Sequence, residues 1–134
     1  MTKFINIFMF STLIVTTIAT IGTKADLIST NKGTIMKFGM QVVMTATPGK
    51  GEELASIMLK AAKLVSKLKG CQVYIVQLST SEKDTVLITE VWNSEEDHKA
   101  SLSVPEIREL IGKAKPLIVS LTHHMAKPLG GVGI

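Results

Sequence analysis

Strict alternation of apolar residues over residues 36–47 constrains the fold of this 134-residue chain more than any other feature. A period of two predicts a β-strand that buries one of its faces. Turn residues follow at 48–51, and apolar residues then recur every three or four positions from Leu54 to Leu68, which predicts an amphipathic helix. The alternating apolar positions of the first strand are Met36, Phe38, Met40, Val42, Met44 and Ala46.

The rest of the chain continues as short strands and short helices. The further predicted elements are, in order, a strand at 71–79, a strand at 85–92, a short helix capped by Asn93 or Ser94, a helix that opens at Pro105 and ends near Pro116, and a strand at 119–127. The order is β-α-β-β-α-β. We therefore expect an α+β domain of the ferredoxin-like type, with an antiparallel four-stranded sheet.

One face of the predicted sheet has no helix left to cover it. Val43 and Thr45 lie opposite the face of Met40, and the second strand adds Val73 and Ile75. Two helical layers can cover only one face, so a second subunit is the economical cover. We expect a homodimer that packs sheet against sheet, as a dimeric α/β barrel.

The first 25 residues read as a targeting segment rather than as part of this domain. Lys3 precedes an uncharged run over 4–23, and small residues at Thr23 and Ala25 suit a cut before Asp26. This pattern predicts a signal peptide over 1–25 and a linker over 26–35, ahead of a domain at 36–134. The protein would then be secreted, or anchored in a membrane if the apolar run is retained.

A third interpretation places the true start of the chain at Met36. Residues 32–36 (Lys-Gly-Thr-Ile-Met) back-translate to a purine-rich stretch just before an ATG, which is typical of a bacterial ribosome-binding site. The protein would then be cytoplasmic, and residues 1–35 would not be translated. The intact mass of the native protein distinguishes the three interpretations.

Composition and motifs exclude several classes of function. The 15 Lys and Arg and the 11 Asp and Glu residues are interspersed, which argues against a nucleic-acid-binding surface. Cys71 is the only cysteine, so no intrachain disulfide and no cysteine metal site are expected. His123 and His124 are neighbours on a strand and point to opposite faces, so we predict no metal. Phosphate loops and nucleophile elbows are absent from the sequence.

The stretch 90–102 carries the residues best suited to chemistry. Glu90 and Trp92 share the apolar face of Ile88 on the third strand. His98 lies four residues before Leu102, so both face inward on the short helix. We expect His98 and Trp92 to converge where the strand meets the helix.

These residues and their order resemble the antibiotic biosynthesis monooxygenase (ABM) domain family, and more closely its quinol monooxygenase branch. The matching segments are 48–54, 90–92, 94–98, 104–108, 115–118 and 130–134. The resemblance covers essentially all of residues 36–134. It implies a dimeric ferredoxin-like barrel that oxygenates a polyphenol or quinol with O2 and needs no cofactor.

The chemistry implied by the resemblance asks the protein for a base and a dry pocket. O2 is a triplet that reacts poorly with closed-shell molecules, but a deprotonated quinol can donate one electron to it. We assign the base to His98, because an unperturbed histidine titrates near neutrality, with Glu90 as the second catalytic candidate. The expected substrate-binding residues are Trp92, Phe38, Met40, Val42, Tyr74 and His124.

Other roles for the same residues stay open at this point. His98 can simply seat its helix, Trp92 can be core, and Glu90 can be a structural partner for a nearby polar group. A non-catalytic ABM-like module that binds a small hydrophobic ligand is therefore the alternative function. Haem binding, known from a sister branch, is less favoured, because that branch has an Asn on the first strand where this chain has Gln41. Titration with haemin tests it.

Overall fold

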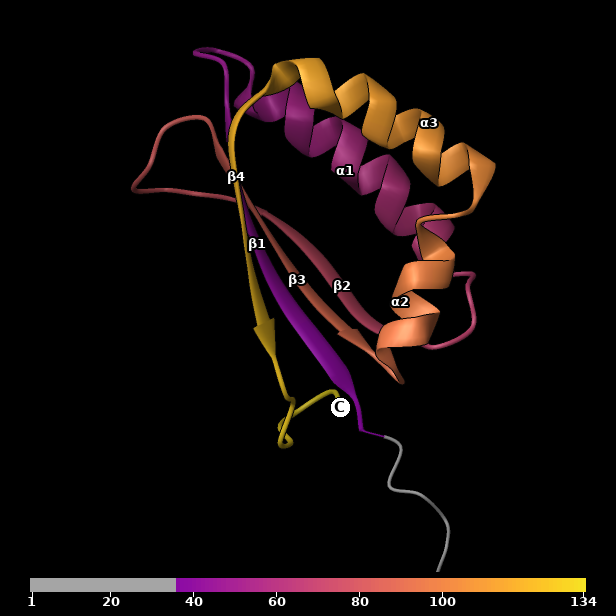
Figure 1. Ribbon diagram of the computed structural model, residues 1–134. Helices are drawn as coiled ribbons and strands as arrows, with labels where there is room; N and C mark the ends of the chain where they lie inside the picture. Colours follow the sequence, from indigo (N-terminus) through magenta and orange to yellow (C-terminus); the bar gives the residue numbers. More distant parts are fainter. Residues whose placement is uncertain (1–35) are drawn as a thin grey trace, which may run out of the picture. The chain divides into compact units, whose positions relative to one another are not determined.

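The computed structural model describes residues 36–134, and the predicted signal peptide, linker and alternative start before residue 36 lie outside them. The elements are β1 (Phe38–Ala46), α1 (Gly51–Val65), β2 (Cys71–Leu78), β3 (Thr85–Trp92), α2 (Glu95–Ser101), α3 (Pro105–Ala114), the 3-10 turn η2 (Lys115–Leu117) and β4 (Ile118–Ala126). The four strands form one antiparallel sheet in the order β2-β3-β1-β4. The predicted α+β ferredoxin-like βαββαβ fold is confirmed (Figure 1).

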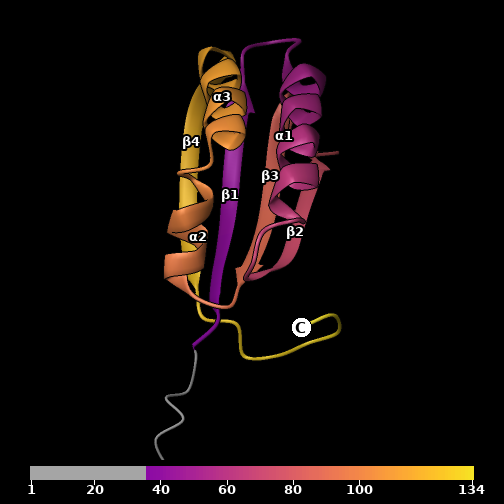
Figure 2. The same ribbon diagram turned by 90° about the vertical axis from the view of Figure 1, so that its right-hand side faces the viewer.

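All helices of the described residues lie on one face of the sheet (Figures 1 and 2). The opposite face is open. It carries Val43, Val73 and Leu87, which are half-buried, and Ile75, which is 50% exposed. The predicted division of the side chains between the two faces is thus confirmed. None of the described helices is long and apolar enough to cross a bilayer.

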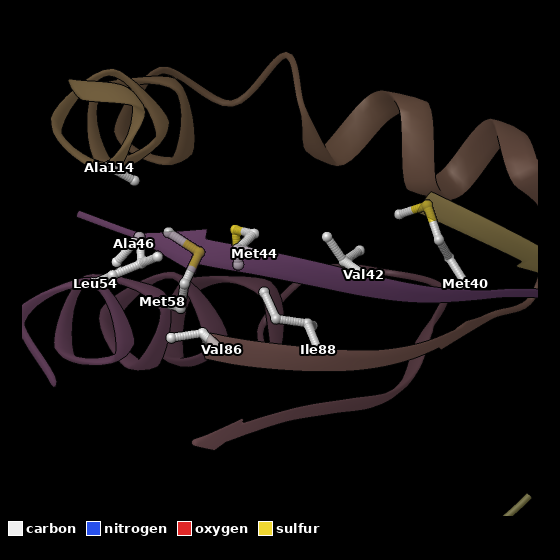
Figure 3. Packing of buried hydrophobic residues seen from close by; sticks show 9 residues of the cluster. All are labelled: Met40, Val42, Met44, Ala46, Leu54, Met58, Val86, Ile88 and Ala114. Atoms are coloured by element: carbon white, nitrogen blue, oxygen red, sulfur yellow. The ribbon is translucent and has the colours of Figure 1, made fainter. Parts of the chain in front are cut away.

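The core fills the space between β1, β3 and the two long helices. Met40, Val42 and Met44 rise from β1 toward the side where Ala114 of α3 lies (Figure 3). Leu54 of α1 is fully buried among them. Burial of each such side chain stabilises the fold by about 1.5–3 kcal/mol. A second, smaller cluster gathers Trp92, Val65 and Ile107 near the ends of β3 and α1.

Helix α1 ends at Val65, three residues earlier than the apolar pattern predicts. Beyond it, the backbone N–H groups of Lys67 and Leu68 bond to carbonyls only three residues back, at 3.1 and 2.9 Å. The hydroxyl of Ser66 also donates to the carbonyl of Lys63, at 3.0 Å. The last turn therefore tightens instead of continuing as α-helix. Leu68 nevertheless packs against the smaller cluster, which explains its place in the apolar pattern.

Asp84 connects the β2–β3 turn to the beginning of α1. Its carboxylate accepts hydrogen bonds from the backbone N–H groups of Gly49 and Gly51, both at 2.9 Å. These two bonds lower the pKa of Asp84. A Cβ on Gly51 would lie 2.6 Å from the Cα of Asp84, so only glycine permits this approach. A carboxylate at the start of α1 also complements the helix dipole.

Candidate functional site

An apolar cleft of about 580 Å³ lies between the helical layer and the sheet. Its floor is the inward face of β1 and β3, and its sides are α3 and β4. The polar groups that line it are Tyr74, Glu90, His98, Lys115 and His123. A mostly apolar cleft of this volume with a few polar groups is typical of a small-molecule site. Another hollow, of about 570 Å³, includes the charged residues Lys37, Glu95, Glu96 and Lys127 in its lining, which suits an aromatic ligand less well.

Strand register sets the positions of the groups on the floor of the cleft. Met40 of β1 lies between Glu90 of β3 and Met125 of β4. One row further along the sheet, Val42 lies between Ile88 and His123. The side chains of each row point to the same face, so Glu90 and His123 both face the cleft from opposite sides of β1.

Glu90 is a buried carboxylate that accepts a hydrogen bond from Trp92. The residue is only 6% exposed. The indole Nε1–H of Trp92 donates a hydrogen bond to Oε2 of Glu90 at 2.9 Å. Burial raises the pKa of Glu90, and the hydrogen bond from Trp92 opposes this by lowering it. Trp92 itself is fully buried, so the indole N–H depends on Glu90 for its partner.

His98 is placed over this pair by the beginning of α2. The hydroxyl of Ser94 caps the helix by accepting from the backbone N–H of Asp97 at 3.1 Å, as the sequence predicts. The imidazole packs against the ring of Phe38, with centroids 5.2 Å apart, and edge-on to Trp92, at 5.6 Å. Its Nε2 lies 3.7 Å from Oε2 of Glu90. The predicted convergence of His98 and Trp92 is confirmed.

The surroundings of His98 favour its neutral form. Burial is the main cause that lowers its pKa, opposed by the negative charge of Glu95 and assisted by the positive charges of His123 and Lys99. A neutral imidazole accepts a proton from a ligand hydroxyl. The resulting imidazolium would lie beside the Glu90 carboxylate at 3.7 Å, which stabilises the protonated product. The arrangement suits a histidine base whose protonated form is stabilised by a neighbouring carboxylate.

The structure brings together most of the predicted site residues and separates one. Met40, Val42, Tyr74, Glu90 and His98 line the cleft. Phe38 and Trp92 contact the imidazole of His98, and Trp92 is fully buried, so it supports His98 and Glu90 from beneath.

His124 is exposed and pairs with Gln41, which puts it on the open face of the sheet. Its neighbour His123 lines the cleft instead. The signal for His123 was present in the sequence, because Leu121 and Met125 flank it at a spacing of two. Alternation groups these three residues on one face of β4, but only pairing with β1 tells which face that is. Within residues 36–134, no three His, Cys, Asp or Glu side chains converge to hold a metal.

The fold and the site together define a small ferredoxin-like protein with an apolar cleft, at which the buried Glu90 lies beside the half-buried His98. The sequence model of the family described as "Antibiotic biosynthesis monooxygenase" matches residues 38–113. The chain belongs to this antibiotic biosynthesis monooxygenase (ABM) family. A comparison with curated proteins finds no significant match.

One solved structure supports the same assignment, and two others share the fold. An antibiotic biosynthesis monooxygenase homologue from Chloroflexus aurantiacus J-10-fl is 41% identical over 73% of this chain and 98% of its own, with a TM-score of 0.68. A solved structure from Caulobacter crescentus CB15 is 18% identical over 71% of this chain and 92% of its own, with a TM-score of 0.66. SnoaB from Streptomyces nogalater, a cofactor-independent oxygenase, is 11% identical over 72% of this chain and 97% of its own, with a TM-score of 0.63. The last two likenesses show the fold alone.

Proposed function

We propose that this protein is a monooxygenase that uses O2 to oxygenate a quinol- or anthrone-type aromatic molecule, without a metal or flavin, in the cleft beside His98. The observation that carries the proposal is the position of His98. A neutral imidazole stands at an apolar cleft large enough for an aromatic ring system, with the Glu90 carboxylate 3.7 Å behind it. Membership of the ABM family supplies the class of reaction, and SnoaB is a fold relative that needs no cofactor.

The first step is proton transfer. The imidazole of His98 takes a proton from the aromatic substrate, and Glu90, whose Oε2 lies 3.7 Å from Nε2, stabilises the imidazolium that forms. A positioned base of this kind typically accelerates a reaction about 10²–10⁴-fold. The apolar floor of Met40 and Val42 excludes water from the substrate anion, which strengthens its interactions with the protein.

The second step uses O2 as the only oxidant. The substrate anion transfers one electron to O2, and the two radicals combine into a peroxide on the reacting carbon. The peroxide takes the proton back from His98. The remaining C–H bond of the reacting carbon and the O–O bond then break, so that the C–H proton leaves with the outer oxygen as water and a carbonyl forms. For an anthrone, one methylene and one O2 become one carbonyl and one water, so atoms and electrons balance. The protein supplies the base, the orientation and a dry site.

We further propose that the protein is a homodimer that packs through the open face of its sheet. Ile75 is 50% exposed on that face, and no helix of residues 36–134 covers it. Polar groups also lie there, because the Thr89 hydroxyl contacts Gln77 at 3.4 Å and Gln41 at 3.3 Å. Such a mixed face suits a subunit interface with ordered water at its polar positions.

The experiment is oxygen uptake with chelator-treated, flavin-free protein. Naphthoquinols and anthrones are offered as substrates, and the rate of their uncatalysed oxidation is subtracted from the measured rate. We expect enzyme-dependent uptake, and a loss of about 10²–10⁴-fold in kcat/KM for His98→Gln. The matched control is His124→Gln, which makes the same change on the opposite face of the sheet and should keep the wild-type rate.

Two outcomes would contradict the proposal. Absence of uptake across the panel, with binding of the same aromatics retained, would favour the non-catalytic ligand-binding module. Equal losses in the His98 and His124 variants would mean that the effect does not come from the cleft.

A further inference from the structure

His123 is a second imidazole at the cleft to which the proposed reaction assigns no task. It is the only polar side chain that β4 contributes to the lining, between Leu121 and Met125, in the part of the chain that the structure describes. These two apolar neighbours are exposed by 48% and 72%, so β4 forms an apolar rim interrupted by one histidine. A lone hydrogen-bonding group on an apolar wall is suited to orient a ligand.

The position of His123 relative to His98 follows from the register of the sheet. His98 stands over Glu90 on β3, and His123 pairs with Val42 on β1, one row further along and one strand beyond. Because neighbouring strands are about 4.8 Å apart, the backbones of Glu90 and His123 are on the order of 10 Å from each other. The two imidazoles therefore lie on either side of the cleft floor at Met40 and Val42.

We infer that His123 binds an oxygen substituent that lies across the ring from the position at which the substrate loses its proton, so that the cleft selects flat aromatic molecules with an oxygen there. This inference rests on the proposed function, and it names the residue that orients the substrate. The position that loses its proton faces His98, and the hydroxyl or carbonyl opposite it faces His123 across one ring. A ring substituted in this way spans the floor of the cleft, while its apolar faces lie on methionine and aliphatic side chains.

Electrostatics and the layout of the cleft agree with this assignment. Burial is the main cause that lowers the pKa of His98, and the charge of His123 lowers it further, so the two side chains interact electrostatically across the cleft. Lys115, the other basic side chain of the lining, precedes β4 near the end of β1 at Ala46. Along the sheet, Lys115 is therefore further from His98 than His123 is. We accordingly assign the two ends of the ligand to His98 and His123.

The test is equilibrium dialysis under argon, where no oxygenation can occur. The probes are 1,4-dihydroxynaphthalene and 1-naphthol, which differ by one hydroxyl. We expect the wild-type protein to bind the diol roughly twofold to tenfold more tightly, which is the worth of one net hydrogen bond. This preference should vanish in His123→Leu and in His123→Phe, either of which suffices if the other fails to fold. It should persist in His124→Leu.

The outcomes separate this inference from the proposed function. Binding of both probes with an unchanged preference in the His123 variants would overturn the role of His123 and leave the proposed function standing. Failure of the wild-type protein to bind either probe would overturn both. A preference lost equally in His124→Leu would also contradict the inference, because that residue faces away from the cleft.

Discussion

Replacement of Glu90 by Gln removes the charge behind His98 while keeping an oxygen that can accept from Trp92. In the wild-type protein, burial lowers the pKa of His98 from its ordinary value near 6.5. The acid limb of kcat/KM, which reports the base of the free enzyme, should therefore have its midpoint below that value. Below the midpoint His98 is protonated and cannot act as a base, so activity rises with pH and then levels off.

The size of the effect follows from the 3.7 Å between His98 Nε2 and Glu90 Oε2. Two unit charges near 4 Å attract by roughly 1 kcal/mol in water and roughly 4 kcal/mol at an effective dielectric constant of 20. Loss of the Glu90 charge should therefore lower the proton affinity of His98 by a factor of roughly 5 to 1,000. The midpoint of the acid limb moves to lower pH, and the plateau falls because His98 becomes a weaker base.

The assay is kcat/KM for oxygen uptake measured from acidic to mildly alkaline pH, in wild type, Glu90→Gln and Glu109→Gln. Glu109 is an exposed carboxylate on α3 that pairs with Lys113, so its replacement controls for the loss of one negative charge. A midpoint that stays in place in Glu90→Gln, or moves equally in both variants, would refute the pairing of Glu90 with the base.

Three further predictions address the fold and the interface. Trp92→Phe leaves the Glu90 carboxylate without its hydrogen-bond donor and should lower the free energy of unfolding by about 1.5–3 kcal/mol, measured by urea titration. Adding Glu90→Leu should recover part of this loss. Strictly additive effects of the two substitutions would contradict the coupling between Trp92 and Glu90. The charged Asp84 should stabilise the wild-type protein above pH 3.8, and this stabilisation should be lost as the pH falls through the lowered pKa of Asp84. Asp84→Asn should abolish it, as measured by melting temperatures over a range of pH. Identical curves for the wild type and the variant would refute the prediction. Ile75→Glu should yield a monomer in analytical ultracentrifugation, whereas Leu59→Glu, on a residue of α1 that is 52% exposed, should leave the dimer intact.

Local patterns in the sequence were sufficient for the order of the elements and for the buried faces of β1 and β3. Alternation identified the buried side of β1, where Met40 and Val42 lie, and the apolar face of β3. Cap and breaker residues marked the start of α2 at Ser94 and the start of α3 at Pro105. These features depend on neighbours along the chain, and a single sequence displays them.

The site required information that only pairing between distant strands provides. The sequence alone does not tell which of His123 and His124 faces the cleft, and His124, the predicted substrate-binding residue, lies on the other face. A shift of one residue in the pairing of β4 with β1 would exchange the two. The depth of Trp92 beneath the cleft likewise depends on packing of the smaller cluster, which no local pattern encodes. The sequence thus predicted most of the residues of the site, but not the register of β4 against β1, which decides which histidine faces the cleft.

Isotope labelling of the product tests oxygenation in the cleft most directly. The chelator-treated protein is given an anthrone under ¹⁸O2, and the product is quenched early and measured by mass spectrometry. The account predicts one ¹⁸O atom in each new carbonyl and a product yield that falls about 10²–10⁴-fold in His98→Gln. A product without ¹⁸O, accompanied by hydrogen peroxide, would contradict the account, because the protein would then oxidise its substrate without inserting oxygen.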